Sequence, residues 1–158
     1  MSSSVRPLPR DPRPHRKIRA SIRAGFVWAI AAAAINCLIW FIAVIAQVEF
    51  RVWTNGGIES GTYVTVGPIG IIGACLLSGL LAGLITGIAA RYIKRIARWI
   101  VVLGVILTLA SLSGPLNQPD AVHASTQVIL IIMHLIAGFM IIFGLVKSVT
   151  VDDTKVTA

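Results

Sequence analysis

Four long apolar stretches alternate with short polar segments along the chain. They lie at about residues 24–47, 68–90, 98–115 and 126–146. A helix needs about 20 largely apolar residues to cross the hydrocarbon core of a bilayer, and each stretch comes close to that length or exceeds it. The pattern therefore predicts an all-α fold, an integral membrane four-helix bundle.

The same stretches divide the chain into three parts. Residues 1–22 are basic and contain four prolines, and such a segment is too polar to bury a core of its own. We expect it to be a disordered cytoplasmic tail. Residues 23–147 form the transmembrane domain, and residues 148–158 form a second, polar cytoplasmic tail.

The loop between the first two apolar stretches is predicted to contain a short β-hairpin. Residues 48–53 alternate between apolar and polar, residues 54–57 (Thr-Asn-Gly-Gly) are typical of a turn, and residues 62–66 are rich in strand formers. Isolated hairpins are marginal in water, so this one would have to rest on the bundle or on the membrane surface. The alternative is a partly ordered loop.

Composition and charge support a membrane location. Only 13% of the residues are charged and 56% are hydrophobic, whereas soluble domains carry about 25% charged residues. Thirteen of the 14 Lys and Arg residues precede the first span, separate the second from the third, or follow the fourth; the exception is Arg51. This is the positive-inside pattern. It predicts a multi-pass membrane protein with both termini in the cytoplasm.

The net charge of +8 also bears on partners. The basic tail could contact anionic lipid at the cytoplasmic face of the bilayer, at about 1 kcal/mol per basic residue close to the surface. No aromatic residue lies among the arginines before Phe26, and stacking aromatics are what single-stranded nucleic acid requires. The predicted partners are therefore the lipid bilayer and anionic lipid, with no nucleic acid.

The second span carries a ladder of small residues formed by Gly79, Gly83 and Gly87. Repeated GxxxG spacing lets two helix backbones approach closely in lipid. The partner helix could belong to the same chain or to a second copy in a homo-oligomer. For a chain with four spans, packing within the chain is the favoured interpretation.

Three polar side chains lie at similar depth on three different spans. Counting along each helix from its inner end, Asn36 and His134 lie ~18 Å deep and Ser111 ~20 Å deep. Thr108 shares the face of Ser111. Pro115 has no backbone N–H, so the carbonyl of Ser111 would lose its helical partner. We expect Asn36, Thr108, Ser111 and His134 to form one polar cluster near the middle of the membrane.

This cluster has two interpretations. It could bind a small polar ligand or relay a proton, or it could join helices through hydrogen bonds of about 0.6 kcal/mol each.

The spans contain no carboxylate, and Cys37 and Cys75 are isolated. A bis-histidine haem site would need a second histidine within the spans, and no nucleophile accompanies a base. The sequence predicts no catalytic residues, no cofactor and no metal site.

Two short motifs indicate a family. Residues 111–116 (Ser-Leu-Ser-Gly-Pro-Leu) and residues 133–137 (Met-His-Leu-Ile-Ala), with Asn36 in an alanine-rich first span, resemble an uncharacterised family of small four-helix actinobacterial membrane proteins, a domain of unknown function. The resemblance covers about residues 22–147. It implies a multi-pass, four-helix protein of the bacterial inner (plasma) membrane, and it brings no assigned activity.

The function predicted from the sequence is that of a non-enzymatic membrane protein with a structural or interaction role. The alternative is a small-molecule or lipid carrier that uses Asn36, Ser111 and His134.

Overall fold

The computed structural model describes residues 14–54, 61–93 and 95–154 of the 158-residue chain. Within these residues, four helical segments are long and apolar enough to cross a membrane. The elements in order are α1 (Pro14–Ile45), β1 (Arg51–Thr54), β2 (Thr62–Thr65), α2 (Pro68–Ala89), α3 (Ile96–Ser111), α4 (Ser113–Leu116) and α5 (Ala124–Thr154). The predicted all-α membrane bundle with a β-hairpin is confirmed.

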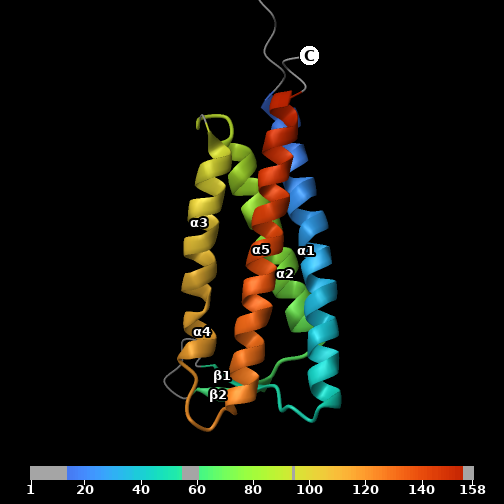
Figure 1. The fold of residues 1–158 in the computed structure, drawn as a ribbon, viewed down its shortest axis with the longest axis vertical. Helices are drawn as coiled ribbons and strands as arrows, with labels where there is room; N and C mark the ends of the chain where they lie inside the picture. Colours follow the sequence, from blue (N-terminus) through green and yellow to red (C-terminus); the bar gives the residue numbers. More distant parts are fainter. Residues whose placement is uncertain (1–13, 55–60, 94, 155–158) are drawn as a thin grey trace, which may run out of the picture.

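The helices form an elongated bundle (Figure 1). Helix α1 packs along both α2 and α5, whereas α3 packs mainly on α5 and touches α2 only slightly. The start of α1, the end of α5 and the α2–α3 connection lie at one end. The β-hairpin, α4 and the turn before α5 lie at the other, which we call the hairpin end.

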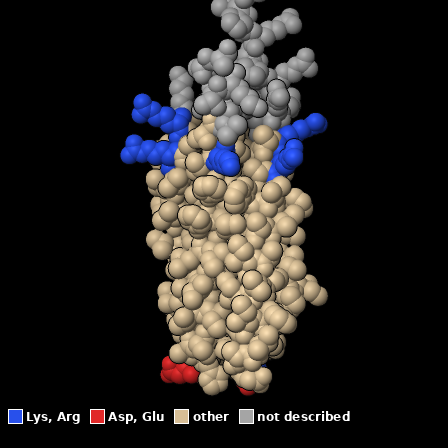
Figure 2. Space-filling model, turned by 45° about the vertical axis from the view of Figure 1, so that its right-hand side comes forward, with Lys and Arg blue, Asp and Glu red and all other residues tan. Residues whose placement is uncertain are grey.

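Charge distinguishes the two ends. Apart from Arg51 in β1, the described Lys and Arg side chains gather at one end of the molecule, and Figure 2 shows the acidic side chains at the other. We call the former the basic end. Its members come from the first part of α1, the α2–α3 connection and the last turns of the fourth span, and they are Arg19, Arg23, Arg91, Arg95, Arg98 and Lys147.

The glycine ladder of α2 lies against α1 of the same chain. A Cβ atom built on Gly83 would lie 2.8 Å from the carbonyl oxygen of Ser21, and one built on Gly87 would lie 2.9 Å from the Cα of Ile18. At Gly79 the added atom would meet the Cβ of Ala29. The two helices therefore touch backbone to backbone, which only glycine permits at these positions.

The first and last helices extend beyond the predicted limits of the transmembrane domain. Residues 14–22, assigned to the tail from the sequence, belong to α1, because Ile18 and Ser21 pack on the glycine ladder. Helix α5 continues past residue 147 to Thr154; there the hydroxyl of Ser148 donates to the carbonyl of Leu145 at 2.7 Å. The predicted disorder of residues 1–13 and the end of the second predicted tail, residues 155–158, lie outside the described residues.

The third span is interrupted at Leu112. Helix α3 ends at Ser111 and α4 begins at Ser113, with Pro115 buried in α4. Pro115 occupies the position whose N–H would normally bond the carbonyl of Ser111, and it has none to give. At the break, the N–H of Leu112 donates to the carbonyl of Leu109 at 3.1 Å, which makes a tighter turn than that of an α-helix. The N–H of Leu116 then donates to the carbonyl of Leu112 at 3.0 Å.

The hairpin rests on the bundle, as expected for a marginal element. Strands β1 and β2 are antiparallel, with Trp53 opposite Tyr63, and the N–H of Val66 donates to the carbonyl of Phe50 at 2.8 Å. Phe50 is only 4% exposed and belongs to a core cluster with Ile71 and Met133. The predicted turn at residues 54–57 lies almost wholly outside the described residues.

Candidate functional site

Asn36 joins three helices inside the bundle. Its side chain is 3% exposed, and its Nδ2 donates to the carbonyl of Met133 in α5 at 3.1 Å and to the Sγ of Cys75 in α2 at 3.7 Å. Its Oδ1 is buried and has no partner among the described residues. Both N–H groups of the amide are therefore used to hold α1 against its two neighbours.

The other predicted cluster residues bond within their own helices. The hydroxyl of Thr108 donates to the carbonyl of Gly104 at 2.8 Å, and the hydroxyl of Ser111 donates to the backbone carbonyl of Thr108 at 2.6 Å. The Nδ1 of His134 lies 2.7 Å from the carbonyl of Leu130. Such local bonds to a carbonyl three or four residues earlier are common for Ser and Thr in helices.

The structure does not bring Asn36, Ser111 and His134 together as one hydrogen-bonded cluster. Ser111 is exposed on α3, and α3 packs on α5 rather than on α1, the helix that carries Asn36. Thr108 instead serves helix packing, because a Cβ atom on Gly138 of α5 would meet its side chain. Asn36 contacts α5 at Met133, the residue before His134, but its side-chain hydrogen bonds go to Met133 and Cys75 and not to Thr108, Ser111 or His134.

Three side chains fix the hairpin to the bundle. We call the hairpin with its flanking residues (49–54 and 61–66) the hairpin cap. The Nε1 of Trp40 in α1 donates to the carbonyl of Val66 at 3.0 Å. Thr126 of α5, which is 0% exposed, donates to the carbonyl of Glu49 at 2.6 Å. Gln118, in the turn after α4, binds the backbone of Trp53.

The contact of Gln118 with Trp53 follows from the strand register. The bond between Val66 and Phe50 sets the alternation of the antiparallel ladder, so the N–H and C=O of Trp53 point away from β2. Gln118 accepts from that N–H at 2.7 Å and donates to that carbonyl at 3.4 Å. Its amide thus takes the place of a neighbouring strand.

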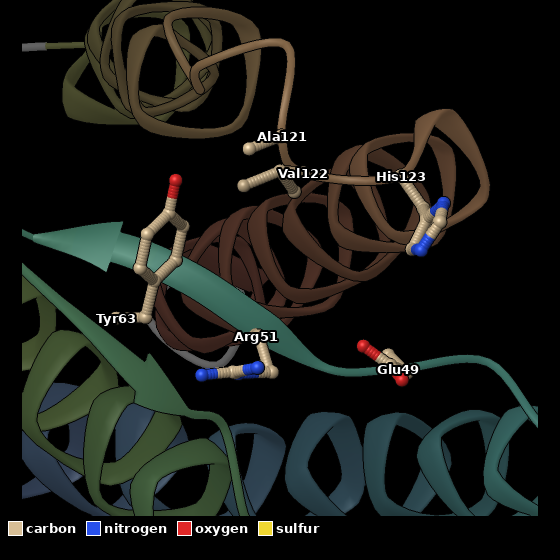
Figure 3. Close-up of a pocket in the computed structure, with 6 residues that line it drawn as sticks. All are labelled: Glu49, Arg51, Tyr63, Ala121, Val122 and His123. Atoms are coloured by element: carbon tan, nitrogen blue, oxygen red, sulfur yellow. The ribbon is translucent and has the colours of Figure 1, made fainter.

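A pocket of about 230 Å³ opens between the hairpin cap and the turn that leads into α5 (Figure 3). The hairpin cap supplies a carboxylate, a guanidinium and a phenol, and the turn supplies an imidazole and two apolar residues. The lining residues are Glu49, Arg51, Tyr63, Ala121, Val122 and His123. All except the buried Val122 are exposed, so the pocket is open to its surroundings.

Aromatic contacts order one side of this pocket. The rings of Trp53 and Tyr63 meet edge to face with centroids 4.9 Å apart. The guanidinium of Arg51 lies 5.7 Å from the centroid of the Tyr63 ring, within the range of a cation–π contact. The sequence analysis missed this site; its only signal was that ionisable residues occur in both loops at the hairpin end.

No group of three or more His, Cys, Asp or Glu side chains that could hold a metal ion occurs in the part of the chain that the structure describes. The lining side chains of the pocket can offer hydrogen bonds, charge and a cation–π contact.

Residues 16–151 match the model of a family of unknown function, DUF6069. The chain belongs to this family. The match covers all four apolar helical segments, the hairpin cap and the pocket, and it confirms the predicted resemblance to an uncharacterised family. Comparison with curated proteins and with solved structures gave no match.

Proposed function

We propose that this DUF6069 protein is a non-enzymatic, multi-pass protein of the bacterial inner (plasma) membrane that acts by interaction at the hairpin end. The observation that carries the proposal is the attachment of the hairpin cap by Trp40, Thr126 and Gln118. A loop that only connected two spans would not need side chains from three separate parts of the chain to hold it. The attachment supports a surface built for contact.

The polar groups of the bundle support a structural rather than a chemical role for the spans. Thr108, Ser111 and His134 bond their own helices, and Asn36 bonds neighbouring helices. Each of these groups already has a hydrogen-bond partner within the bundle, which favours a structural role for the spans. Contact with an external partner is therefore assigned to the hairpin cap, where Trp53 and Tyr63 remain 36% and 41% exposed.

The basic end supports the proposed orientation and lipid partner. Basic residues on short loops favour the cytoplasm, which supports a cytoplasmic location for both termini and an outward-facing hairpin cap. Anionic lipid of the inner leaflet would contact the basic end, with each basic residue near the surface contributing about 1 kcal/mol.

One observation supports the alternative of a small-molecule or lipid carrier. The Oδ1 of Asn36 is a buried acceptor without a partner among the described residues, and a donor on a ligand could satisfy it. The carrier would have to rely on Asn36 without Ser111, which is exposed on α3.

Photocrosslinking in native membranes tests the interaction role. A photoreactive residue at Tyr63, in the hairpin cap, is compared with one at Leu107, which is 67% exposed on α3. We expect adducts at residue 63 that are absent at residue 107 and that disappear when Gln118→Ala releases the hairpin cap. Identical lipid adducts at both positions would contradict the proposal.

A further inference from the structure

We infer that the pocket at the hairpin end binds a small zwitterion, with its ammonium group at Glu49 and its anionic oxygens at Arg51. The inference rests on the proposed function, because it assigns a ligand class to the same surface. Its support is the placement of opposite charges, the contacts that order the residues carrying them, and the size of the pocket.

The two charges lie on one side of the pocket without meeting each other. Arg51 is the first residue of β1 and Glu49 lies two positions before it, about 7 Å away along an extended chain. Figure 3 shows the guanidinium of Arg51 turned toward Tyr63 and away from the carboxylate of Glu49. A ligand that carries both an ammonium and an anionic group can contact both residues at once.

The backbone of Glu49 and the guanidinium of Arg51 are held before a ligand arrives. The carbonyl of Glu49 accepts from the fully buried Thr126, which fixes the backbone at that point. The guanidinium of Arg51 lies over Tyr63, and Tyr63 packs against Trp53. Groups that are ordered in advance lose less conformational entropy when a ligand binds.

The rest of the lining matches the same polarity. His123 lies on the side of Glu49, and the hydroxyl of Tyr63 lies on the other side of the pocket (Figure 3). An imidazole nitrogen and a carboxylate accept hydrogen bonds from an ammonium, whereas a guanidinium and a phenol donate to anionic oxygens. Ala121 and Val122 supply an apolar surface for the carbon atoms that link the two poles.

A ligand of a single charge fits this arrangement less well. An anion would bring its charge toward the carboxylate of Glu49, and a cation would bring its charge toward Arg51. The volume of about 230 Å³ also lies below the roughly 300–1,000 Å³ of pockets for drug-sized ligands. These limits favour a compact zwitterion, which could be a free solute or the head group of a phospholipid.

Binding of glycerophosphoethanolamine to the purified full-length chain in a non-ionic detergent tests the inference. This probe carries an ammonium and a phosphodiester, whereas glycerophosphoglycerol is the matched control without an amine. We expect saturable binding of the first probe and none of the second. Glu49→Gln and Arg51→Gln should each weaken binding roughly tenfold, because each removes one charge-assisted contact. Arg98→Gln, at the basic end, should leave it unchanged.

Repeating the titration in lipid nanodiscs distinguishes a phospholipid head group from a free solute as the source of the ligand. If a phosphatidylethanolamine head group fills the pocket, nanodiscs of that lipid will suppress probe binding and nanodiscs of phosphatidylglycerol will not. If the ligand is a free solute, the probe will bind in both. Either result supports the zwitterion site.

Three results would overturn the inference: no saturable binding, equal binding of the two probes, or binding unaffected by both charge-removing variants. Circular dichroism and size-exclusion chromatography check that each variant is folded. If specific adducts form at residue 63 while the probe does not bind, the ligand class is wrong and the interaction role stands. If both fail, the proposed function fails as well.

Discussion

The side-chain amide of Gln118 pairs with both backbone groups of Trp53, 65 positions earlier in the chain. The same Nε2 donates to the carbonyl of Gly114 in α4 at 3.0 Å. One side chain therefore ties the edge of β1 to the end of the third span. The hairpin cap owes its position to contacts of this kind rather than to its own two strands.

Gln118→Ala should release the edge of β1. The N–H of Trp53 then loses its acceptor, and we expect its amide exchange to rise about tenfold while the free energy of unfolding falls by about 1 kcal/mol. Hydrogen–deuterium exchange measured by mass spectrometry on hairpin-cap peptides checks this. Gln127→Ala, a change of the same type on α5, is the control. Equal exchange in both variants would show that the Gln118 contact does not hold the hairpin cap.

Thr126→Val should destabilise the protein through the hairpin cap. Valine keeps the shape of the side chain but removes the hydroxyl that bonds the carbonyl of Glu49 in a fully buried position. The cost should be about 1–3 kcal/mol, and Thr126→Ser should recover most of it. Denaturation in mixed micelles measures both. If serine is no better than valine, the hydroxyl does not provide the stability.

Asn36→Ala and Ser111→Ala should differ in their effect on stability. Asn36 joins α1 to α5, so its loss should lower the free energy of unfolding by about 0.6–1.7 kcal/mol. Ser111 is exposed and bonds only its own helix, so its loss should have almost no effect. Unfolding measured in the same micelles compares the two. A similar cost for both would favour the joint cluster predicted from the sequence.

Two glycines of α2 should respond to alanine in opposite ways. Gly83→Ala places a methyl group 2.8 Å from the carbonyl of Ser21, and separating the helices should cost about 1–3 kcal/mol. Gly73 has no neighbouring atom within 4 Å of the added carbon, so Gly73→Ala should be neutral or stabilise by up to about 1 kcal/mol. Thermal unfolding of the two variants measures this difference in stability. Equal effects would mean that α1 and α2 are not in backbone contact.

Cysteine labelling of intact cells should report the orientation. In a background with Cys37 and Cys75 replaced by alanine, Thr62→Cys should react with an impermeant maleimide. Tyr92→Cys, at an 80% exposed position near the basic end, should react only after the membrane is permeabilised. The opposite pattern would reverse the proposed topology.

The parts of the fold that could be predicted from the sequence are those with a local signal. The four spans follow from apolar length, and the hairpin follows from alternation between Val48 and Trp53 and from the strand formers after Thr62. The glycine spacing of α2 indicates a close helix contact. These signals depend on residues that are neighbours in the chain, so they can be recognised without any knowledge of the tertiary structure.

The polar contacts could not be predicted in the same way. Depth along a helix does not say which helices are neighbours, and α3 lies on α5, so Ser111 is exposed instead of joining Asn36. The pocket combines Glu49 with His123, which belong to different loops. Helix order in a bundle depends on packing between distant segments, which no local pattern encodes.

The attachment of the hairpin cap also constrains the order in which the protein can be completed. A ribosome makes the chain from its N-terminus, so α1 and α2 can form their glycine contact before the later spans exist. Gln118 and Thr126 follow both strands in the sequence, and the hairpin cap cannot be locked until they emerge and α5 is inserted. A locked hairpin cap therefore marks a molecule whose last helix is in place, and a partner that recognises it would bind only fully assembled copies.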